Sequence, residues 1–572
     1  MTTPVFEETL TKNVPELLQE AKILSTHLLS KKEELTETMS SKQLTEQLRI
    51  LDEINHKLLT ASCLSDAAFS VDQENEEKSQ LLKQVTDANT AIHQQLIYFS
   101  LELKKWKQET LRRHEQELPE YQAYLRAVRT GAKHALSEAE EKIISTKDKY
   151  ASNALTKIYD LITGAYLFTI EIEGETKQVT KSELSMLMQS TDRTIRKKAR
   201  DSFYEQYEPD KHVLNEIYTA IIGDFQEEAI LRGYNNPIDV RHQRNEIEQE
   251  TYTSIVQTAK NRNNLFIEYI DLKKQILGYK TFYGYDIRAN IPGLPKGLPY
   301  KEAKQEMLAA FSEYAGWMKE AAKQIHTSKR IDALARKNKR GGACCYEVAP
   351  GEEPILILNH EEDYESLKTL AHETGHAIHD VLAAKHTTFN YHPQLVLAET
   401  ASNLAENLIF EKTLRQANKQ EQQALLCDYL DDALASISAQ LLYTEFEEYT
   451  HKNPDATLTQ RCNYWSKLQQ QKLPNVKRER ENKEHLDYGW ISIPHIYQTP
   501  FYCYAYSFGL LLALSLKQQA SPETIKNLLE AGGSKTPKEL LAKYGFDITT
   551  TQFWNEAFNE IELLIKKLRR TL

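Results

Sequence analysis

Hydrophobic side chains recur at helical spacing along most of this chain of 572 residues. Residues three or four positions apart share one face of an α-helix, so a run of this kind predicts an amphipathic helix. Three clear runs are Leu17, Ala21, Leu24 and Leu28; Leu81, Val85, Ala88, Ile92 and Leu96; and Trp554, Phe558, Ile561, Ile565 and Leu568. Polar stretches at 36–42 and 65–75 predict breaks between the N-terminal helices. The pattern therefore predicts a mainly α-helical protein.

The hydrophobic period changes to two in two places, and each change predicts a small β structure. Residues 168–172 and 178–180 flank a Glu-Gly-Glu turn, which predicts a hairpin. Residues 341–348 and 354–359 predict a strand, a turn and a second strand. The glycines at the start of the first of these strands, Gly341 and Gly342, are suited to the close approach of another backbone. A small sheet is thus expected directly before the next helix.

That next helix contains His372-Glu373-Thr374-Gly375-His376, an H-E-x-x-H signature. Its two histidines are four positions apart, so both imidazoles project from one face and can bind one metal ion. Glu373 lies beside them and can hydrogen-bond a water held at the metal. Apolar neighbours indicate that the helix is packed inside the protein, where unpaired polar groups are costly. The signature predicts a hydrolytic site with one zinc ion per chain.

A third metal ligand is expected from a nearby element. Glu399 is the one carboxylate in the apolar helical stretch 395–404, and a charge there requires a partner. The residues between His376 and Glu399 are enough to end the first helix, form a loop and bring a second helix back antiparallel to the first. Three histidines are rival candidates, of which His379 is expected in the core or behind the ligands, whereas His386 and His392 are expected to be exposed in a loop.

Tyrosines surround a single histidine between residues 495 and 506. Tyr502 and Tyr506 are four positions apart and share a helix face, so two hydroxyl groups can point into one site. Such donors can stabilise the oxyanion that forms when water adds to a peptide carbonyl. A buried hydroxyl needs a partner, and a core alone does not require so many of them.

Four segments carry a resemblance to a known family. They are 372–379, Ala398-Glu399-Thr400-Ala401-Ser402, Pro494-His495-Ile496-Tyr497 and 500–509. Together they are similar to the M3 family of zinc metallopeptidases and, within it, to the oligoendopeptidase F branch. The likeness extends from about residue 110 to the C-terminus, whereas the first hundred residues match only in being helical.

The resemblance implies a large helical, zincin-like fold with a small β-sheet beside the metal helix and a deep substrate channel between helical lobes. Such a channel admits short peptides and excludes folded proteins. By motif match, His495, Tyr502 and Tyr506 bind substrate and the transition state. Tyr504 is held in reserve, because the spacing of this loop differs between branches of the family.

Three regions are expected along the chain. Residues 1–110 form an N-terminal helical region, 111–205 a helical lobe with the hairpin, and 206–572 the M3-like catalytic region. The segment 291–299 is the richest in proline and glycine and is the best candidate for a linker.

Charge is spread through the chain rather than gathered in blocks. The net charge is −11 and 27% of residues are charged, which offers no electrostatic basis for binding nucleic acid. Arg241, His242 and Arg244 follow a turn and are predicted to form surface salt bridges, with peptide contact as the alternative. The oligomeric state is left open.

Other sequence features bear on location. No apolar run approaches the 18 residues of a membrane helix, and the N-terminus lacks the pattern of a signal peptide. Six cysteines without C-x-x-C spacing indicate reduced thiols. These features predict a cytoplasmic protein that does not act at a membrane.

The predicted function is that of a zinc-dependent endopeptidase, which hydrolyses internal bonds of short oligopeptides with Glu373 as general base. One alternative is another H-E-x-x-H hydrolase such as a carboxypeptidase, which should hold the substrate's terminal carboxylate with a cationic group. A second is a non-catalytic helical scaffold whose zinc is structural, although structural sites usually have four protein ligands. No motif of a serine or cysteine nucleophile is present.

Overall fold

Helices make up most of the described chain, and the predicted mainly α-helical fold is confirmed. The computed structural model describes residues 10–478 and 487–572. They form two units, each with its own core. Unit 1 comprises the described part of Met1–Glu138 together with Lys296–Thr413 and Leu516–Asp547, and unit 2 comprises Ala139–Pro295, Leu414–Ser515 and Ile548–Leu572. The passage from Pro295 to Lys296 lies within the segment predicted as a linker.

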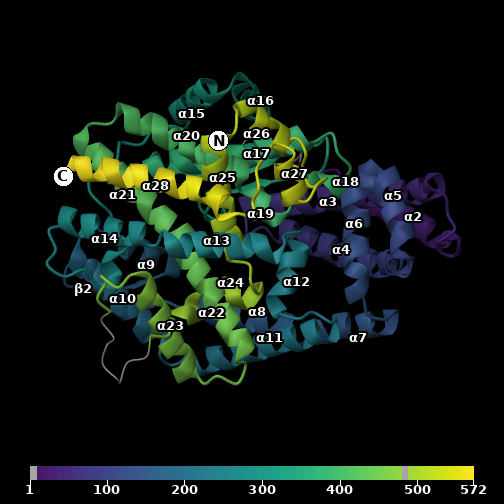
Figure 1. The fold of residues 1–572 in the computed structure, drawn as a ribbon, viewed down its shortest axis with the longest axis horizontal. Coiled ribbons are helices and arrows are strands. Elements are labelled where there is room, and N and C mark those ends of the chain that lie inside the picture. Colours follow the sequence, from purple (N-terminus) through teal and green to yellow (C-terminus); the bar gives the residue numbers. More distant parts are fainter. Residues whose placement is uncertain (1–9, 479–486) are drawn as a thin grey trace. The chain divides into compact units, whose positions relative to one another are not determined.

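Unit 1 begins with a bundle in which α2, α3 and α4 contact one another and α6 packs on α4 (Figure 1). Leucines of these helices, spaced as the sequence predicts, fill its core. The helices of this unit are α2 Val14–Ser30, α3 Ser41–Val71, α4 Glu76–Lys104, α5 Gln108–Glu117, α6 Gln122–Gly131, α15 Tyr300–Tyr314, α16 Gly316–Thr327, α17 Tyr364–Ala383, α18 Thr388–Tyr391, α19 Leu395–Ala398, α26 Pro522–Leu529 and α27 Pro537–Ala542, with most of α20 Thr400–Gln416.

The break predicted at 65–75 occurs only after Val71, because α3 continues through this polar stretch. Ser65 is buried and its hydroxyl donates to the carbonyl of Ser62, one turn earlier in the same helix. The hydroxyl of Ser70 bonds to that of Tyr346. Ser65 bonds within its own helix and Ser70 bonds to another side chain, so neither hydroxyl competes for the backbone bonds of α3 and the helix continues.

A three-stranded sheet in unit 1 has the order β3-β5-β4. Its strands are β3 Ile331–Leu334, β4 Cys344–Tyr346 and β5 Ile355–His360. The antiparallel pair β4–β5 confirms the predicted strand, turn and strand, whereas the parallel strand β3 was not foreseen. Both β4 and β5 contact α17, and within this sheet β4 is an edge strand.

Unit 2 is also helical, and α28 packs along α13, α14 and α21 (Figure 1). The hairpin of β1 Phe168–Ile172 and β2 Glu175–Val179 forms as predicted. The helices are α7 Glu138–Asp148, α8 Ser152–Gly164, α9 Lys181–Leu187, α10 Arg193–Tyr207, α11 Lys211–Leu231, α12 Pro237–Arg244, α13 Gln249–Asn261, α14 Asn264–Ile276, α21 Lys419–Ala433, α22 Gln440–Lys452, α23 Leu458–Lys472, α24 Pro494–Gln498 and α28 Thr551–Thr571, with most of α25 Tyr504–Gln519. A π-helical segment, Leu434–Ala439, joins α21 to α22.

Candidate active site

Helix α17 carries the H-E-x-x-H signature in unit 1. Asp363 caps its first turn by accepting a hydrogen bond from the backbone N–H of Ser366. One turn separates His372 from His376, and their Nε2 atoms lie 3.2 Å apart. Buried residues lie along the helix both before and after the signature. The sequence argument for an interior helix is therefore correct.

Gly375 lets a second helix approach α17 closely. A Cβ atom at this position would lie 2.6 Å from the carbonyl oxygen of Ala401 and 2.6 Å from the Cα of Ser402, both at the start of α20. Any side chain here would force the two helices apart. The glycine inside the signature thus has a packing function that the spacing of the histidines did not reveal.

The sequence predicted Glu399 in the middle of one helix, but the structure places it at a break between two helices. Helix α19 ends at Ala398 and α20 begins at Thr400. The carbonyl of Glu399 accepts the first backbone bond of α20, from Asn403. Its side chain accepts a hydrogen bond of 2.7 Å from the hydroxyl of Ser402. The break orients the carboxylate, and Ser402 restrains it.

His372, His376 and Glu399, which we call the metal region, present three donor atoms to one point. Oε2 of Glu399 lies 3.3 Å from Nε2 of His376 and 3.5 Å from Nε2 of His372. With bonds of about 2.0–2.2 Å, the corners of a tetrahedral zinc site lie about 3.3–3.6 Å apart. Two nitrogens and a carboxylate at this separation suit zinc, and these three side chains are the group in the described chain that could hold a metal.

Glu406 is a part of this site that the sequence reasoning missed. The Nδ1–H of His372 donates to its carboxylate, which leaves Nε2 free to act as the donor toward a metal. Glu406 follows Glu399 by seven positions, two helical turns, so it returns to the same side of α20. That spacing was the signal available in the sequence.

The carboxylates set the charge state of the metal region. Burial alone would lower the pKa of His372, but the hydrogen bond to Glu406 and the nearby carboxylates raise it to about 9. Burial would raise the pKa of Glu399, but the hydrogen bond to His376 and the charges of both histidines lower it to about 2. The metal region therefore holds an ionised Glu399 carboxylate beside a His372 imidazole that would release its proton when a metal binds.

Glu373 is buried beside strand β4. Its burial raises the pKa of its carboxyl group, and the two histidines of the signature partly oppose that shift. The backbone N–H of Cys345 donates a hydrogen bond to its carboxylate. A carboxylate of raised pKa next to a metal site is suited to accept and return a proton.

The rival histidines have other environments. His379 is buried in the core, and burial lowers its pKa to about 4, so it is neutral. His386 bonds to the carbonyl of Glu530. His392 pairs with Glu347 at 2.8 Å, and both it and His386 lie outside helices, as expected, but are partly buried rather than exposed. None of the three belongs to the group that could hold a metal.

Gly341 and Gly342 do not face another backbone. A Cβ at either position would meet nothing within 4 Å, so the space beside these glycines is open, and the approach of a substrate backbone there stays a prediction. Gly342 has a φ of +79°, a conformation that residues other than glycine rarely adopt. Its carbonyl accepts a hydrogen bond from the side-chain amide of Asn359 on β5.

His495, Tyr502 and Tyr506, which we call the tyrosine region, lie together in unit 2. The hydroxyl of Tyr506 and Nε2 of His495 are 3.2 Å apart. The rings of His495 and Tyr502 are stacked, with centroids 5.8 Å apart. Helix α25 is fixed next to Tyr506, where the hydroxyl of Ser507 donates to the carbonyl of Ser436 in the π-helical segment.

Tyr504, the reserve candidate, has a different environment. It is 1% exposed, and its hydroxyl accepts a hydrogen bond of 2.7 Å from the side-chain amide of Asn245. Nδ1 of His242 lies 3.1 Å from the same hydroxyl. Arg241 and His242 are themselves buried, so the prediction that they form surface salt bridges is wrong.

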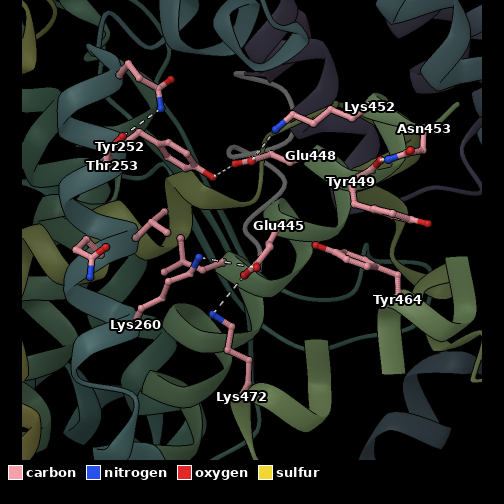
Figure 2. Close-up of a pocket in the computed structure, with 14 residues that line it drawn as sticks. Tyr252, Thr253, Lys260, Glu445, Glu448, Tyr449, Lys452, Asn453, Tyr464 and Lys472 are labelled. Carbon is pink, nitrogen blue, oxygen red and sulfur yellow. Dashed lines mark hydrogen bonds and ion pairs between the residues drawn. The ribbon is translucent and has the colours of Figure 1, made fainter. Parts of the chain in front are cut away.

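A cavity of about 440 Å³ in unit 2 is lined by α13, α22 and α23 (Figure 2). Lys260 and Lys472 both face Glu445 across it, and the hydroxyl of Tyr252 donates to Glu448. None of the predicted site residues lines it. Within the described ranges, no helix has both the length and the apolar character needed to cross a bilayer.

Sequence comparisons with known proteins identify the family to which this chain belongs. The chain matches the model of peptidase family M3 over residues 186–560 and the model described as oligopeptidase F over residues 101–168. It is 26% identical over 466 residues to the group B oligopeptidase PepB of Streptococcus agalactiae, covering 78% of this chain and 76% of that protein. An oligoendopeptidase F homolog of Lactococcus lactis is 28% identical, with coverage of 76% and 74%.

A solved structure supports the same fold. The oligoendopeptidase-F of Enterococcus faecium superposes with a TM-score of 0.72 at 21% identity, covering 98% of this chain and 99% of that one. The family model accounts for more than half of the chain. The predicted resemblance is confirmed, and this chain belongs to peptidase family M3.

Proposed function

We propose that this protein is a zinc-dependent endopeptidase that hydrolyses internal bonds of short oligopeptides. The observation that carries the proposal is the convergence of three donor atoms, from His372, His376 and Glu399, beside the buried carboxyl group of Glu373. Membership of a peptidase family supports it. The relatives named as oligopeptidases support short peptides as the class of substrate.

His372, His376 and Glu399 would hold one zinc ion per chain. When bound, zinc supplies Lewis acidity, which polarises a peptide carbonyl and lowers the pKa of water. Glu406 orients His372 through the Nδ1–H bond and so directs Nε2 toward the ion. Three protein ligands leave a coordination position for chemistry, whereas a structural zinc site usually has four.

Glu373 is the proposed general base. Its carboxylate accepts a proton from the attacking water and returns it to the leaving amine. Burial favours the protonated form of this group after transfer, because it raises the pKa of the carboxyl group. The hydrogen bond from the backbone of Cys345 keeps the carboxylate oriented before transfer.

The edge strand β4 is the proposed binding surface for the peptide backbone. Its partner β5 occupies one side of it, and the substrate would add as a further strand on the other side. Main-chain hydrogen bonds of this kind tolerate many side chains, which suits an enzyme for mixed peptides.

His495, Tyr502 and Tyr506 are proposed to bind substrate and to stabilise the oxyanion. Hydroxyl groups are suitable donors for this purpose, and each contributes about 3–4 kcal/mol in comparable sites. Six free cysteines agree with a reducing compartment, and we propose the cytoplasm as the location.

The proposed function is tested by measuring the zinc content and the peptide cleavage of two proteins, wild type and Glu373→Gln. Purified protein should contain one zinc per chain and should cleave an internally quenched peptide blocked at both ends. Glu373→Gln should abolish cleavage while zinc stays bound. Failure to cleave the blocked peptide, with release of single residues from free C-termini, would instead indicate a carboxypeptidase. Zinc binding without any cleavage would indicate a structural site.

A further inference from the structure

The turn between α24 and α25 contains an unusual backbone conformation. Phe501 has a φ of +59°, in the left-handed region that non-glycine residues seldom occupy. Its ring is buried, with centroids 4.6 Å from His451 and 6.1 Å from Phe225. A residue held in this conformation needs support from its surroundings. Tyr502 of the tyrosine region is the next residue.

The support comes from two buried side chains that grip the same peptide group. Nε of Arg241 donates to the carbonyl of Pro500 at 3.3 Å. The N–H of Phe501, at the other end of that peptide bond, donates to Oε1 of Glu447 at 2.7 Å. Arg241 is 7% exposed and Glu447 is 0% exposed. Because both ends of one peptide plane are bonded, the plane cannot rotate without breaking a buried hydrogen bond.

Glu447 differs from its acidic neighbours on α22. Glu445 and Glu448 face the cavity of Figure 2, where lysines lie 3.6–3.9 Å from their carboxylates. Glu447 is buried, and its second oxygen, Oε2, has no hydrogen-bond partner in residues 10–478 and 487–572. A buried acid with no salt bridge in the described part of the chain is costly for the fold, and its hydrogen bond with Phe501 offsets part of that cost.

Burial also controls the charge of this group. It raises the pKa of Glu447 to about 8, against the opposing effects of the Phe501 bond and of Arg241. The carboxyl group is therefore mostly protonated at neutral pH. Glutamine has the same shape and still offers a carbonyl oxygen, so it is a close mimic of this neutral acid.

We propose that Arg241 and Glu447 are positioning residues which clamp the Pro500–Phe501 peptide group and thereby hold Tyr502 and Tyr506 in their working arrangement. The inference rests on the proposed function, because it assumes that these tyrosines act on the substrate. Neither positioning residue needs to touch the substrate.

Two backbone hydrogen bonds of the turn connect the clamped peptide group to the tyrosine region. The N–H of Thr499 donates to the carbonyl of His495 at 2.8 Å, and the N–H of Tyr502 donates to the carbonyl of Thr499 at 3.1 Å. His495 and Tyr502 are thus linked on both sides of the clamped peptide. Rotation of that peptide would displace the Tyr502 ring from the face of His495.

Three variants on one helix test the clamp. Glu447→Met removes the acceptor, Glu447→Gln retains it, and Glu445→Met removes an acid of the same helix that faces the cavity. We expect Glu447→Met to lower kcat about 10- to 100-fold with KM and zinc content nearly unchanged, since a displacement of about 1 Å can cost that much. Glu447→Gln and Glu445→Met should stay within about threefold of wild type.

Hydrogen exchange gives a readout that does not depend on activity. The amides of residues 499–505 should exchange faster in Glu447→Met than in wild type, and at the wild-type rate in Glu447→Gln. Equal kcat values for Glu447→Met and Glu445→Met, or unchanged exchange in this segment, would overturn the proposal. If Glu447→Met does not fold, Arg241→Met tests the carbonyl end of the same peptide, with exposed Arg244→Met as its control.

The two proposals fail in different ways. If the wild-type protein cleaves no peptide, the proposed function is wrong, yet faster exchange in Glu447→Met would still demonstrate the clamp. If wild type is active and Glu447→Met is equally active, the enzyme assignment stands and the positioning role is wrong.

Discussion

The metal region and the tyrosine region are held in place by opposite means. In the metal region, the absence of a side chain at Gly375 lets α20 approach α17, and the donor atoms follow from the helix crossing. In the tyrosine region, two buried side chains distant in sequence grip one peptide group. The first arrangement depends on fit between backbones, and the second on polar contacts inside the core.

This difference predicts separate consequences. A change in the metal region should appear first as a loss of bound metal. A change in the tyrosine region should appear as slower turnover with the metal retained. Metal content and kcat, measured on the same variant, therefore distinguish the two regions.

The largest effect is expected from Tyr506→Phe. Loss of one oxyanion donor typically lowers kcat about 100- to 1,000-fold. Zinc content should stay at one per chain. Tyr504→Phe is the matched control, because its hydroxyl is bonded to Asn245 in the core, and it should lower thermal stability rather than kcat. The opposite ranking of the two variants would move the role from Tyr506 to Tyr504.

Gly375→Ala should cause the next largest effect. The added Cβ would lie 2.6 Å from the backbone of α20, so the helices must separate, and zinc sites tolerate only about 0.2 Å in ligand distance. We expect at least about a 100-fold loss of zinc affinity, by competition with a chelating dye. Gly223→Ala, in α11, meets nothing within 4 Å and should instead raise stability by about 0.5–1 kcal/mol. Normal zinc binding by Gly375→Ala would refute the close-crossing argument.

Glu406→Gln should weaken zinc binding about 10- to 100-fold, because His372 loses a charged partner for its Nδ1–H. Glu411→Gln, on the same helix, removes the ion pair with Lys517 and serves as the control. Equal zinc affinities for the two variants, measured by the same dye competition, would mean that Glu406 does not support the metal.

The smallest effect on turnover is expected from Glu447→Gln, whose measurable consequence concerns stability and pH. The folded-state pKa of Glu447 is raised to about 8 by burial, from 4.5, so this group's stabilising contribution is present below pH 4.5 and is lost as pH rises to about 8. Within that window the contribution falls by about 1 kcal/mol per pH unit. Urea unfolding at several pH values should show a shallower decline for Glu447→Gln. Parallel declines in the two proteins would contradict a buried, neutral carboxyl group.

Much of the metal region could be predicted from the sequence because its signal is local. The spacing of His372 and His376 on a helix fixes their common face. Glu399 stood out as the single acid in an apolar stretch. The break in the helix at Glu399 was not predicted, since no glycine or proline marks it.

The supports of the tyrosine region could not be read from the sequence. The run Glu445-Phe446-Glu447-Glu448 does not show which acid is buried, because that depends on where α22 lies. Arg241 and His242 follow a turn and were expected at the surface, but tertiary packing buries both. Long-range contacts of this kind leave no periodic pattern.

The break at Glu399 has a consequence for the response of the site to acid. Because α20 starts at the next residue, the carboxylate stands at the positive end of that helix's macrodipole, which favours its anionic form. Acidification should therefore displace the ion by protonating His372 while the carboxylate of Glu399 remains charged. The charged carboxylate of Glu399 would then be ready to bind the cation again once neutrality returns.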